Sequence, residues 1–175
     1  LAIKAWKEFK NCRISLSKRL GASIPSIRVG HSLGCKLHLI SPDGGRNCEK
    51  FISISFNNFS ASTSIPFLKQ VSQKFEFTSE FSPSPERTLR IIKKTYNQKN
   101  NVLIKFDSDE LDQTDKLFSC LKGRKEDNSK GLILKGTHTV IASAGLREKY
   151  LGDWADDDFK RNTIKKISNL IDQLV

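Results

Sequence analysis

The stretch SIRVGHSLGCKLHLI, residues 26–40, carries the strongest local signal in the chain. Its first part, Ser26–Gly30, is short and apolar, which predicts a buried strand. From Cys35 to Ile40 the apolar spacing becomes helical, and the breaker run Ser41–Gly45 ends that helix. Residues 31–34 must then form a sharp turn, so the chain passes directly from a strand into a helix.

This turn matches the G-x-S-x-G pattern of a nucleophile elbow, with glycines at Gly30 and Gly34 around Ser32. In such an elbow a strained backbone lifts the serine hydroxyl clear of the sheet. We expect a side chain at either glycine to clash with the neighbouring elements. The amide of Leu33 starts the helix and would point at a developing oxyanion. The pattern alone is weak, but the strand before it and the helix after it strengthen it, and Ser32 is the candidate nucleophile.

Strands and helices alternate along the rest of the chain. Apolar runs predict further strands at Phe51–Phe56, Asn101–Phe106 and Gly131–Lys135. Amphipathic spacing predicts helices over residues 5–20, 67–73, 84–96 and 116–121, and from about residue 156 to the tail. This alternation predicts an α/β fold with a mostly parallel sheet and helices on both faces. The length of 175 residues fits one domain, residues 1–175.

A nucleophilic serine needs a general base, and the chain has three histidines. His31 lies inside the elbow, and we expect its side chain to point away from the serine. His38 lies in the following helix, where we expect a packed or surface side chain. His138 directly follows the fourth predicted strand, where a loop can bring its imidazole over the serine. His138 is therefore the candidate base.

The base needs an orienting carboxylate, and residues 107–115 after the third predicted strand hold five acids. We favour Asp109, which lies three residues beyond the strand, precedes apolar Leu111 and resembles the acid turn of alpha/beta-hydrolases. Asp112, about one helical turn further on, is the alternative. Several of these acids can instead cap the next helix. That interpretation does not exclude one of them from serving the histidine.

The three candidates follow one another along the chain as Ser32, Asp109 and His138, the order expected of an alpha/beta-hydrolase. Each comes at the carboxyl end of a predicted parallel strand, where open α/β sheets bind ligands. We therefore expect a serine hydrolase, or a related acyl transferase, that acts on an ester or thioester without a cofactor. The alternative is a hydrolase-like fold that serves as a non-catalytic binding module, because no single carboxylate of the acidic stretch stands out.

The chain is basic, with 30 Lys and Arg against 19 Asp and Glu, a formal net charge of +11. The whole excess lies in the first 100 residues, which could be a nucleic-acid footprint. These cations, however, alternate with apolar residues at helical spacing and lack interleaved stacking aromatics. We expect solvated helix faces and no nucleic-acid partner. No apolar run is long enough to predict a membrane span.

The four cysteines form no CxxC pair, and no histidine stands at zinc-ligand spacing from them. The N-terminal residues do not resemble a secretion signal, so we expect four reduced core thiols and no metal. The chain contains no methionine and begins at Leu1. We expect the natural protein to start upstream of it.

Several runs of the sequence resemble an uncharacterised family of cyanobacterial and plastid proteins, the domain of unknown function 1350. The runs are VGHSLGCKLHL (29–39), ISFNNF (54–59), IPF (65–67), LIKF (103–106) and LDQT (111–114). That family is grouped with the alpha/beta-hydrolases, so the resemblance implies this fold and a cyanobacterial cytoplasmic or plastid location. It covers about residues 25–140, and Ser32 stands in its most specific run. The resemblance implies no particular substrate.

Compared with the complete alpha/beta-hydrolase fold, the chain begins late. We expect the strands that precede the nucleophile strand to lie outside these 175 residues, together with the loop that supplies a second oxyanion donor. Residues 59–98, between the second and third predicted strands, correspond to the lid or cap insertion of such hydrolases. Their phenylalanines either contact an apolar acyl or ring-bearing substrate or seal the lid onto the body.

Overall fold

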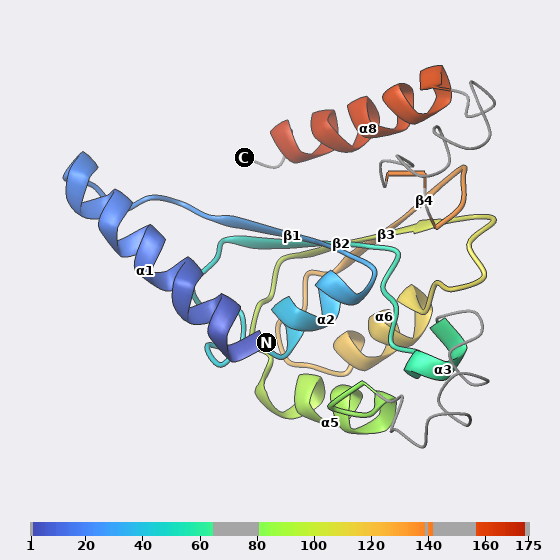
Figure 1. Cartoon of the computed structure of the whole chain (residues 1–175), viewed down its shortest axis with the longest axis horizontal. Helices are drawn as coiled ribbons and strands as arrows, with labels where there is room; N and C mark the ends of the chain where they lie inside the picture. Colours follow the sequence, from blue (N-terminus) through green and yellow to red (C-terminus); the bar gives the residue numbers. More distant parts are fainter. Residues whose placement is uncertain (1, 65–80, 139, 142–156, 174–175) are drawn as a thin grey trace, which may run out of the picture.

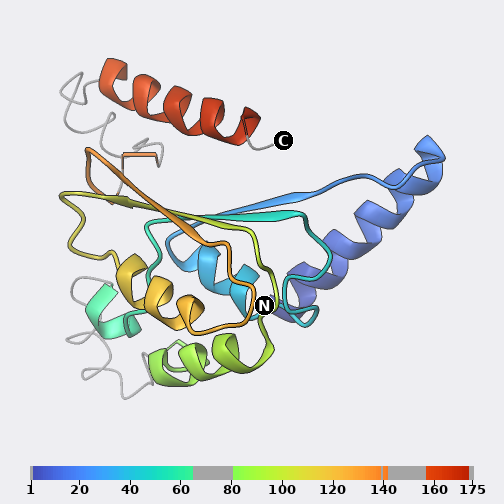
Figure 2. The same cartoon turned by 180° about the vertical axis from the view of Figure 1, so that it is seen from behind.

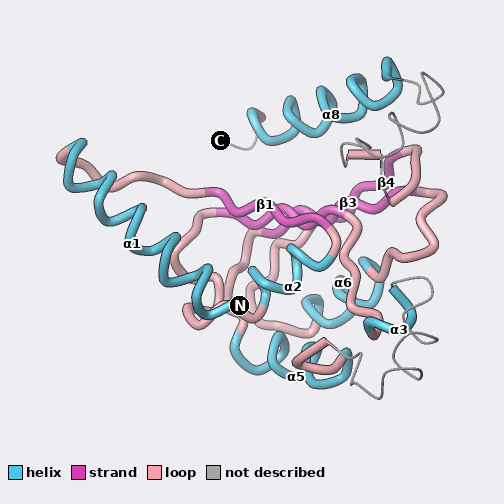
Figure 3. The backbone as a smooth tube through the Cα atoms, viewed as in Figure 1, coloured by secondary structure: helices cyan, strands magenta, loops and turns pink. Residues whose placement is uncertain are grey.

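The computed structural model describes residues 2–64, 81–138, 140–141 and 157–173. Within them, four parallel strands form one sheet in the order β1-β2-β3-β4. Their bounds are β1 (Ile27–His31), β2 (Lys50–Ile54), β3 (Asn101–Phe106) and β4 (Lys130–Leu134), drawn in magenta in Figure 3. The predicted parallel sheet is therefore confirmed. Strand β2 ends two residues before its predicted end, since Ser55 has a positive φ of 50°.

Successive strands are joined by helices that all lie on one face of the sheet (Figure 1). They are α2 (Leu33–Leu39), α5 (Pro85–Thr95) and α6 (Thr114–Lys122). Each strand pairs with the next one along the chain, so right-handed crossovers put every connecting helix on the same side. The opposite face is covered by α8 (Asp157–Asp172), as Figures 1 and 2 show. Helices therefore cover both faces, as the strand–helix alternation predicts.

Two apolar clusters fill the space between the sheet and these helices. The cluster under α2, α5 and α6 contains Cys35, Leu39, Phe51, Phe56, Ile92, Tyr96, Leu103, Leu117 and Leu121. The cluster under α8 contains Ile52, Ile54, Val102, Ile104, Phe106, Val140 and Ile167. Strands β2 and β3 contribute alternate residues to the two clusters, which explains why both read as nearly continuous apolar runs.

Helix α5 falls within the predicted lid segment, yet it packs into the body of the domain through Ile92 and Tyr96. Its start agrees with the sequence, since the Ser84 hydroxyl accepts a hydrogen bond from the Arg87 amide and Pro85 is the first helical residue. A short helix, α3 (Ala61–Ser64), precedes it and was not expected. The predicted helix at residues 67–73 lies outside the described residues, and the lid remains a prediction.

The first helix, α1 (Ala2–Leu20), leaves much of its apolar stripe uncovered by the described residues. Phe9, Leu16 and Leu20 are 42%, 46% and 64% exposed, so the sequence predicts the helix but not its packing. In Figure 1 the amino-terminal end of α1 lies near α2, and its far end projects beyond the amino ends of the strands. Arg13 ties it to the body by donating to the carbonyls of Ile24 and Asn47.

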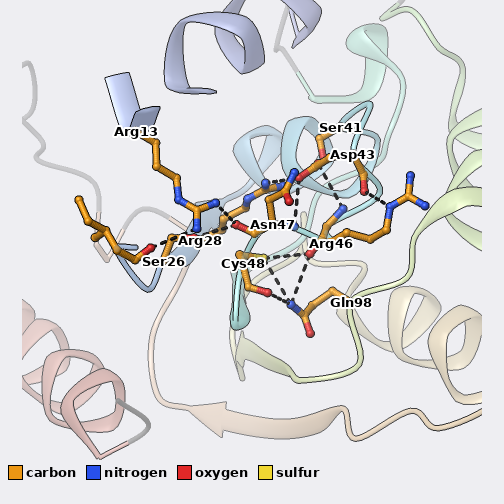
Figure 4. A network of polar contacts seen from close by, with 11 residues as sticks. Arg13, Ser26, Arg28, Ser41, Asp43, Arg46, Asn47, Cys48 and Gln98 are labelled. Carbon is orange, nitrogen blue, oxygen red and sulfur yellow. Dashed lines mark hydrogen bonds and ion pairs between the residues drawn. The ribbon is translucent and has the colours of Figure 1, made fainter. Parts of the chain in front are cut away.

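A buried polar network holds the loop between α2 and β2 (Figure 4). Its centre is the ion pair between Arg28 and Asp43, with Nη1–Oδ1 at 3.1 Å and Nη2–Oδ2 at 2.5 Å. The Ser41 hydroxyl and the Gly45 amide also donate to Asp43. Elsewhere, Lys36 is only 4% exposed and donates to the carbonyl of Pro83. Part of the basic excess of the first 100 residues is therefore structural, which corrects its interpretation as solvated helix faces alone.

Among the described residues, no helix is long and apolar enough to span a bilayer.

Candidate active site

The elbow lies at the carboxyl end of β1 and has a strained backbone. Ser32 has φ 55° and ψ −126°, and its amide continues the sheet pairing by donating to the Ile54 carbonyl at 3.0 Å. A non-glycine residue with positive φ is uncommon and is typical of functional turns. Helix α2 starts at the next residue, Leu33, whose amide belongs to the first turn and has no intrahelical acceptor.

The two glycines of the elbow are not equivalent. A Cβ on Gly30 would lie 2.8 Å from the backbone N and Cα of Cys35, so only glycine lets α2 approach β1 this closely. A Cβ on Gly34 would meet no heavy atom within 4 Å among the described residues. The prediction that both positions exclude a side chain is therefore wrong for Gly34, because that residue faces away from the β1–α2 contact.

The structure brings the three predicted residues into one hydrogen-bonded series. His138 Nε2 lies 2.8 Å from Ser32 Oγ, and His138 Nδ1 lies 2.8 Å from Asp109 Oδ2. The carboxylate is fully buried, whereas the imidazole is 16% exposed and the serine half-buried. The second oxygen of Asp109 accepts the amide of Leu111 at 2.9 Å. The carboxylate is thus held from both sides, with one oxygen directed at the histidine.

The loops after β3 and β4 are linked to each other, which fixes the distance between acid and base. Asp107 accepts the amide of Gly136 at 3.0 Å, and the amide of Ser108 donates to the Gly136 carbonyl at 3.0 Å. Gly136 has φ 139°, a value that L side chains rarely adopt. These contacts explain how residues 29 positions apart in the sequence meet in one pair.

The alternative acid, Asp112, is engaged elsewhere. Its carboxylate accepts the amide and the hydroxyl of Thr114, at 2.8 and 2.7 Å, and so caps α6. The same Thr114 hydroxyl accepts the Phe56 amide at 3.3 Å, tying the end of β2 to α6. Burial raises the pKa of Asp112, against the effect of the Thr114 bonds, and nearby Asp109 raises it further. Of the two candidate acids, only Asp109 has a hydrogen bond to the histidine among the described residues.

The elbow histidine departs from expectation. His31 Nε2 lies 2.9 Å from the backbone carbonyl of His138, and the two rings lie 5.0 Å apart at 37°. Sequence reasoning placed this side chain away from the site. The missed signal is strand alternation: Ile27 and His31 are separated by an even number of residues, so both face the side where Val140 and the His138 loop pack. His38 is a packed residue as expected, with its ring 5.6 Å from that of Phe51.

The cysteines are free, but they are not all core residues. Cys35 is fully buried behind the elbow and donates to the Gly30 carbonyl. Cys12 is exposed, and Cys48 and Cys120 are half-buried. The expectation of four core thiols is therefore wrong, because α1 leaves Cys12 in solvent and only Cys35 is fully buried.

The arrangement has the parts needed for acyl transfer. A half-buried hydroxyl contacts an imidazole whose other nitrogen contacts a buried carboxylate, and an amide of the first helical turn follows the serine. Such a site can activate the hydroxyl as a nucleophile and stabilise the imidazolium that forms when it loses its proton.

Comparisons with known proteins agree with the topology. The chain is similar in structure to a monoacylglycerol lipase of Paleococcus ferrophilus, with a TM-score of 0.51, 12% identity, and coverage of 91% of this chain and 74% of the lipase. It is also similar to DcsB, solved in complex with its substrate analogue, with a TM-score of 0.52, 12% identity, and coverage of 92% and 73%.

A search of the curated proteins finds no match. Residues 8–165, however, match the profile of one family, described as a protein of unknown function (DUF1350). The chain thus has the alpha/beta-hydrolase fold and belongs to the DUF1350 family.

Proposed function

We propose that this protein is a serine hydrolase that cleaves an ester or thioester through a covalent acyl-enzyme. The observation that carries the proposal is the pair of 2.8 Å hydrogen bonds that His138 makes, one with the Ser32 hydroxyl and one with the Asp109 carboxylate. The strained backbone at Ser32 supports the same role, since strain of this kind persists where a function requires it.

In the first half of the reaction, Ser32 Oγ attacks the carbonyl carbon of the substrate and gives its proton to His138 Nε2. Asp109 fixes the imidazole with its proton on Nδ1 and stabilises the resulting imidazolium. The amide of Leu33 donates to the oxyanion, and the carbonyl reforms as the bond to the leaving group breaks. His138 returns the proton to the departing alkoxide or thiolate.

In the second half, water attacks the acyl-enzyme with His138 as base. The acid product leaves and Ser32 recovers its proton. An alcohol or amine in place of water would make the same chemistry an acyl transfer. Every proton in this cycle passes through the imidazole, so the proposal needs no cofactor.

The substrate class is proposed from the chemistry of the site and from the fold it shares with a lipase. A cap over residues 59–98, an apolar substrate under its phenylalanines, and a cyanobacterial or plastid location all remain predictions. A second oxyanion donor from outside the described residues is likewise a prediction.

The test is labelling of the purified protein with a fluorophosphonate probe, read out as intact mass. Labelling requires an activated serine, so we expect one adduct on the wild-type protein, none on Ser32→Ala and a slow reaction on His138→Ala. Ser55→Ala is a matched control, since it removes another serine hydroxyl, one just after the neighbouring strand β2. The substitution leaves the hydrogen bond between Ser32 and His138 in place.

If the wild-type protein takes the label, unlabelled protein should hydrolyse esters or thioesters in a substrate screen, with turnover lost in Ser32→Ala and after labelling. A folded wild-type protein that takes no label would exclude the proposal and favour the non-catalytic binding module.

A further inference from the structure

We propose that His31 is a positioning residue that clamps the backbone of His138 and thereby holds the imidazole between Ser32 and Asp109. The inference rests on the proposed function for its catalytic consequence, but its structural part can be tested without any activity.

The first argument is topological. Ser32 follows β1 and His138 follows β4, which are the first and last strands of the four-stranded sheet formed by the described residues. The His138 loop must therefore return across the carboxyl ends of β3 and β2 to reach the serine. Strand β4 is also the least buried of the four strands, with three of its five residues exposed and none fully buried. A base carried on such a loop needs a fixed contact at the far side of the sheet.

Two contacts fix the loop on the Asp109 side, namely the hydrogen bonds between Gly136 and residues 107–108. On the β1 side, the described residues give the loop two hydrogen bonds. One is the bond between Ser32 and the imidazole itself, which must break and reform during the reaction. The other, from His31 Nε2 to the His138 carbonyl, holds the main chain and can persist throughout the cycle.

The chemistry of the contact assigns the proton. A backbone carbonyl only accepts hydrogen bonds, so His31 must carry its proton on Nε2. Burial lowers the pKa of His31 and the neighbouring imidazole of His138 lowers it further, against the effects of the bond to the His138 carbonyl and of Asp109. The lowered pKa favours the neutral form of His31. A neutral ring 5.0 Å away does not oppose the positive charge that His138 gains when it accepts the serine proton.

Substitutions can separate the hydrogen bond from the ring packing. His31→Phe keeps an aromatic ring against His138 but loses the donor, whereas His31→Gln keeps an N–H donor of similar reach and loses the ring. His38→Phe is the matched control, since it replaces another half-buried histidine, one that packs on Phe51 outside the site. Thermal unfolding of each variant shows whether the fold is retained.

The first readout is the imidazole itself, observed by NMR of protein labelled with ¹⁵N in histidine. We expect His138 to be a single Nδ1–H tautomer in the wild-type protein, in His31→Gln and in His38→Phe. We expect it to become a mixture of tautomers in His31→Phe. A single unchanged tautomer in folded His31→Phe would overturn the proposal, whatever the activity.

The second readout is the rate of fluorophosphonate labelling. Misplacement of a catalytic group by about 1 Å can cost about a hundredfold in rate. We expect His31→Phe to react about ten- to a hundredfold more slowly, and His31→Gln to stay close to the wild type. Equal rates in His31→Phe and the wild type would also overturn the clamp. Absence of labelling in the wild type with the tautomer change intact would overturn the proposed function alone.

Discussion

Asp109 and His138 meet across the ends of β3 and β4, with the carboxylate Oδ2 2.8 Å from the imidazole Nδ1. The carboxylate is completely buried, so it exchanges no hydrogen bonds with solvent, while the 16% exposed imidazole remains open on its other side to the serine. A buried acid and an accessible base in this order favour a proton path from Ser32 to the imidazole, with the carboxylate as its fixed support.

The two candidate acids can be separated by matched substitutions. We expect Asp109→Asn to lower turnover by about 10⁴-fold, because an amide can donate to Nδ1 and so stabilise the wrong tautomer. Asp112→Asn should keep turnover within a few-fold of the wild type and change the stability by less than about 1 kcal/mol, because its amide oxygen can still accept the Thr114 amide. Labelling rates and urea unfolding of both variants give the comparison. Reversed effects on turnover would make Asp112 the acid.

The elbow glycines give a steric test. Gly30→Ala should destabilise the protein by about 1–3 kcal/mol, because its methyl group would lie 2.8 Å from the backbone of Cys35 and push α2 away from β1. Gly34→Ala should leave the stability unchanged or raise it by up to about 1 kcal/mol, since alanine favours the helix and meets no described atom. Urea unfolding at neutral pH measures both. Equal losses of stability in the two variants would contradict the difference between the two glycines.

The Arg28–Asp43 pair should make the stability sensitive to acid. Burial alone would raise the pKa of Asp43, but hydrogen bonds from Arg28 and Ser41 outweigh it and hold that pKa below its ordinary value. The unfolded chain therefore binds the proton more readily than the folded protein. The contribution of Asp43 to the free energy of unfolding is complete above the ordinary carboxyl pKa of about 4. It is lost progressively as the pH falls below that value.

For this pair we expect Asp43→Asn to cost about 3–5 kcal/mol at pH 7, because it leaves the buried guanidinium of Arg28 without its counter-charge. The difference from the wild type should shrink as the pH falls below about 4. Glu126→Gln is the control, since it removes an exposed ion pair with Lys99 and should change little. A constant difference between pH 7 and pH 3, measured by urea unfolding, would argue against the linkage.

Alkylation should distinguish the thiols. Burial raises the pKa of Cys35 to about 12, so its thiolate is scarce and inaccessible in the folded protein. We expect iodoacetamide at pH 8 to modify exposed Cys12 first and Cys35 only after unfolding. Peptide mass mapping over time checks the order. Early modification of Cys35 would mean that the contact between α2 and β1 opens in solution.

Much of the fold follows from local sequence. The apolar runs and the breakers between them predict all four strands. The predicted bounds of β3 (Asn101–Phe106) agree with the structure at both ends, because a strand buried on both faces is a nearly continuous apolar run. The Ser84-Pro85 start of α5 is also local, since capping needs only neighbouring atoms. The elbow is predictable for the same reason: Gly30 and Ser32 satisfy a steric demand that operates within five residues.

Tertiary structure decided what depends on distant contacts. The choice of Asp109 over Asp112 depends on the loop after β4, and the exposure of α1 depends on which elements pack against it. Neither is encoded in a short stretch of sequence. The contact of His31 with His138 joins residues 107 positions apart. The sequence by itself determined the sheet, the elbow and the place of Ser32 in it, because these arise from local sterics and apolar periodicity. Only the folded chain determined the partners of His138, since a hydrogen-bonded series across strand ends exists only once the strands are paired.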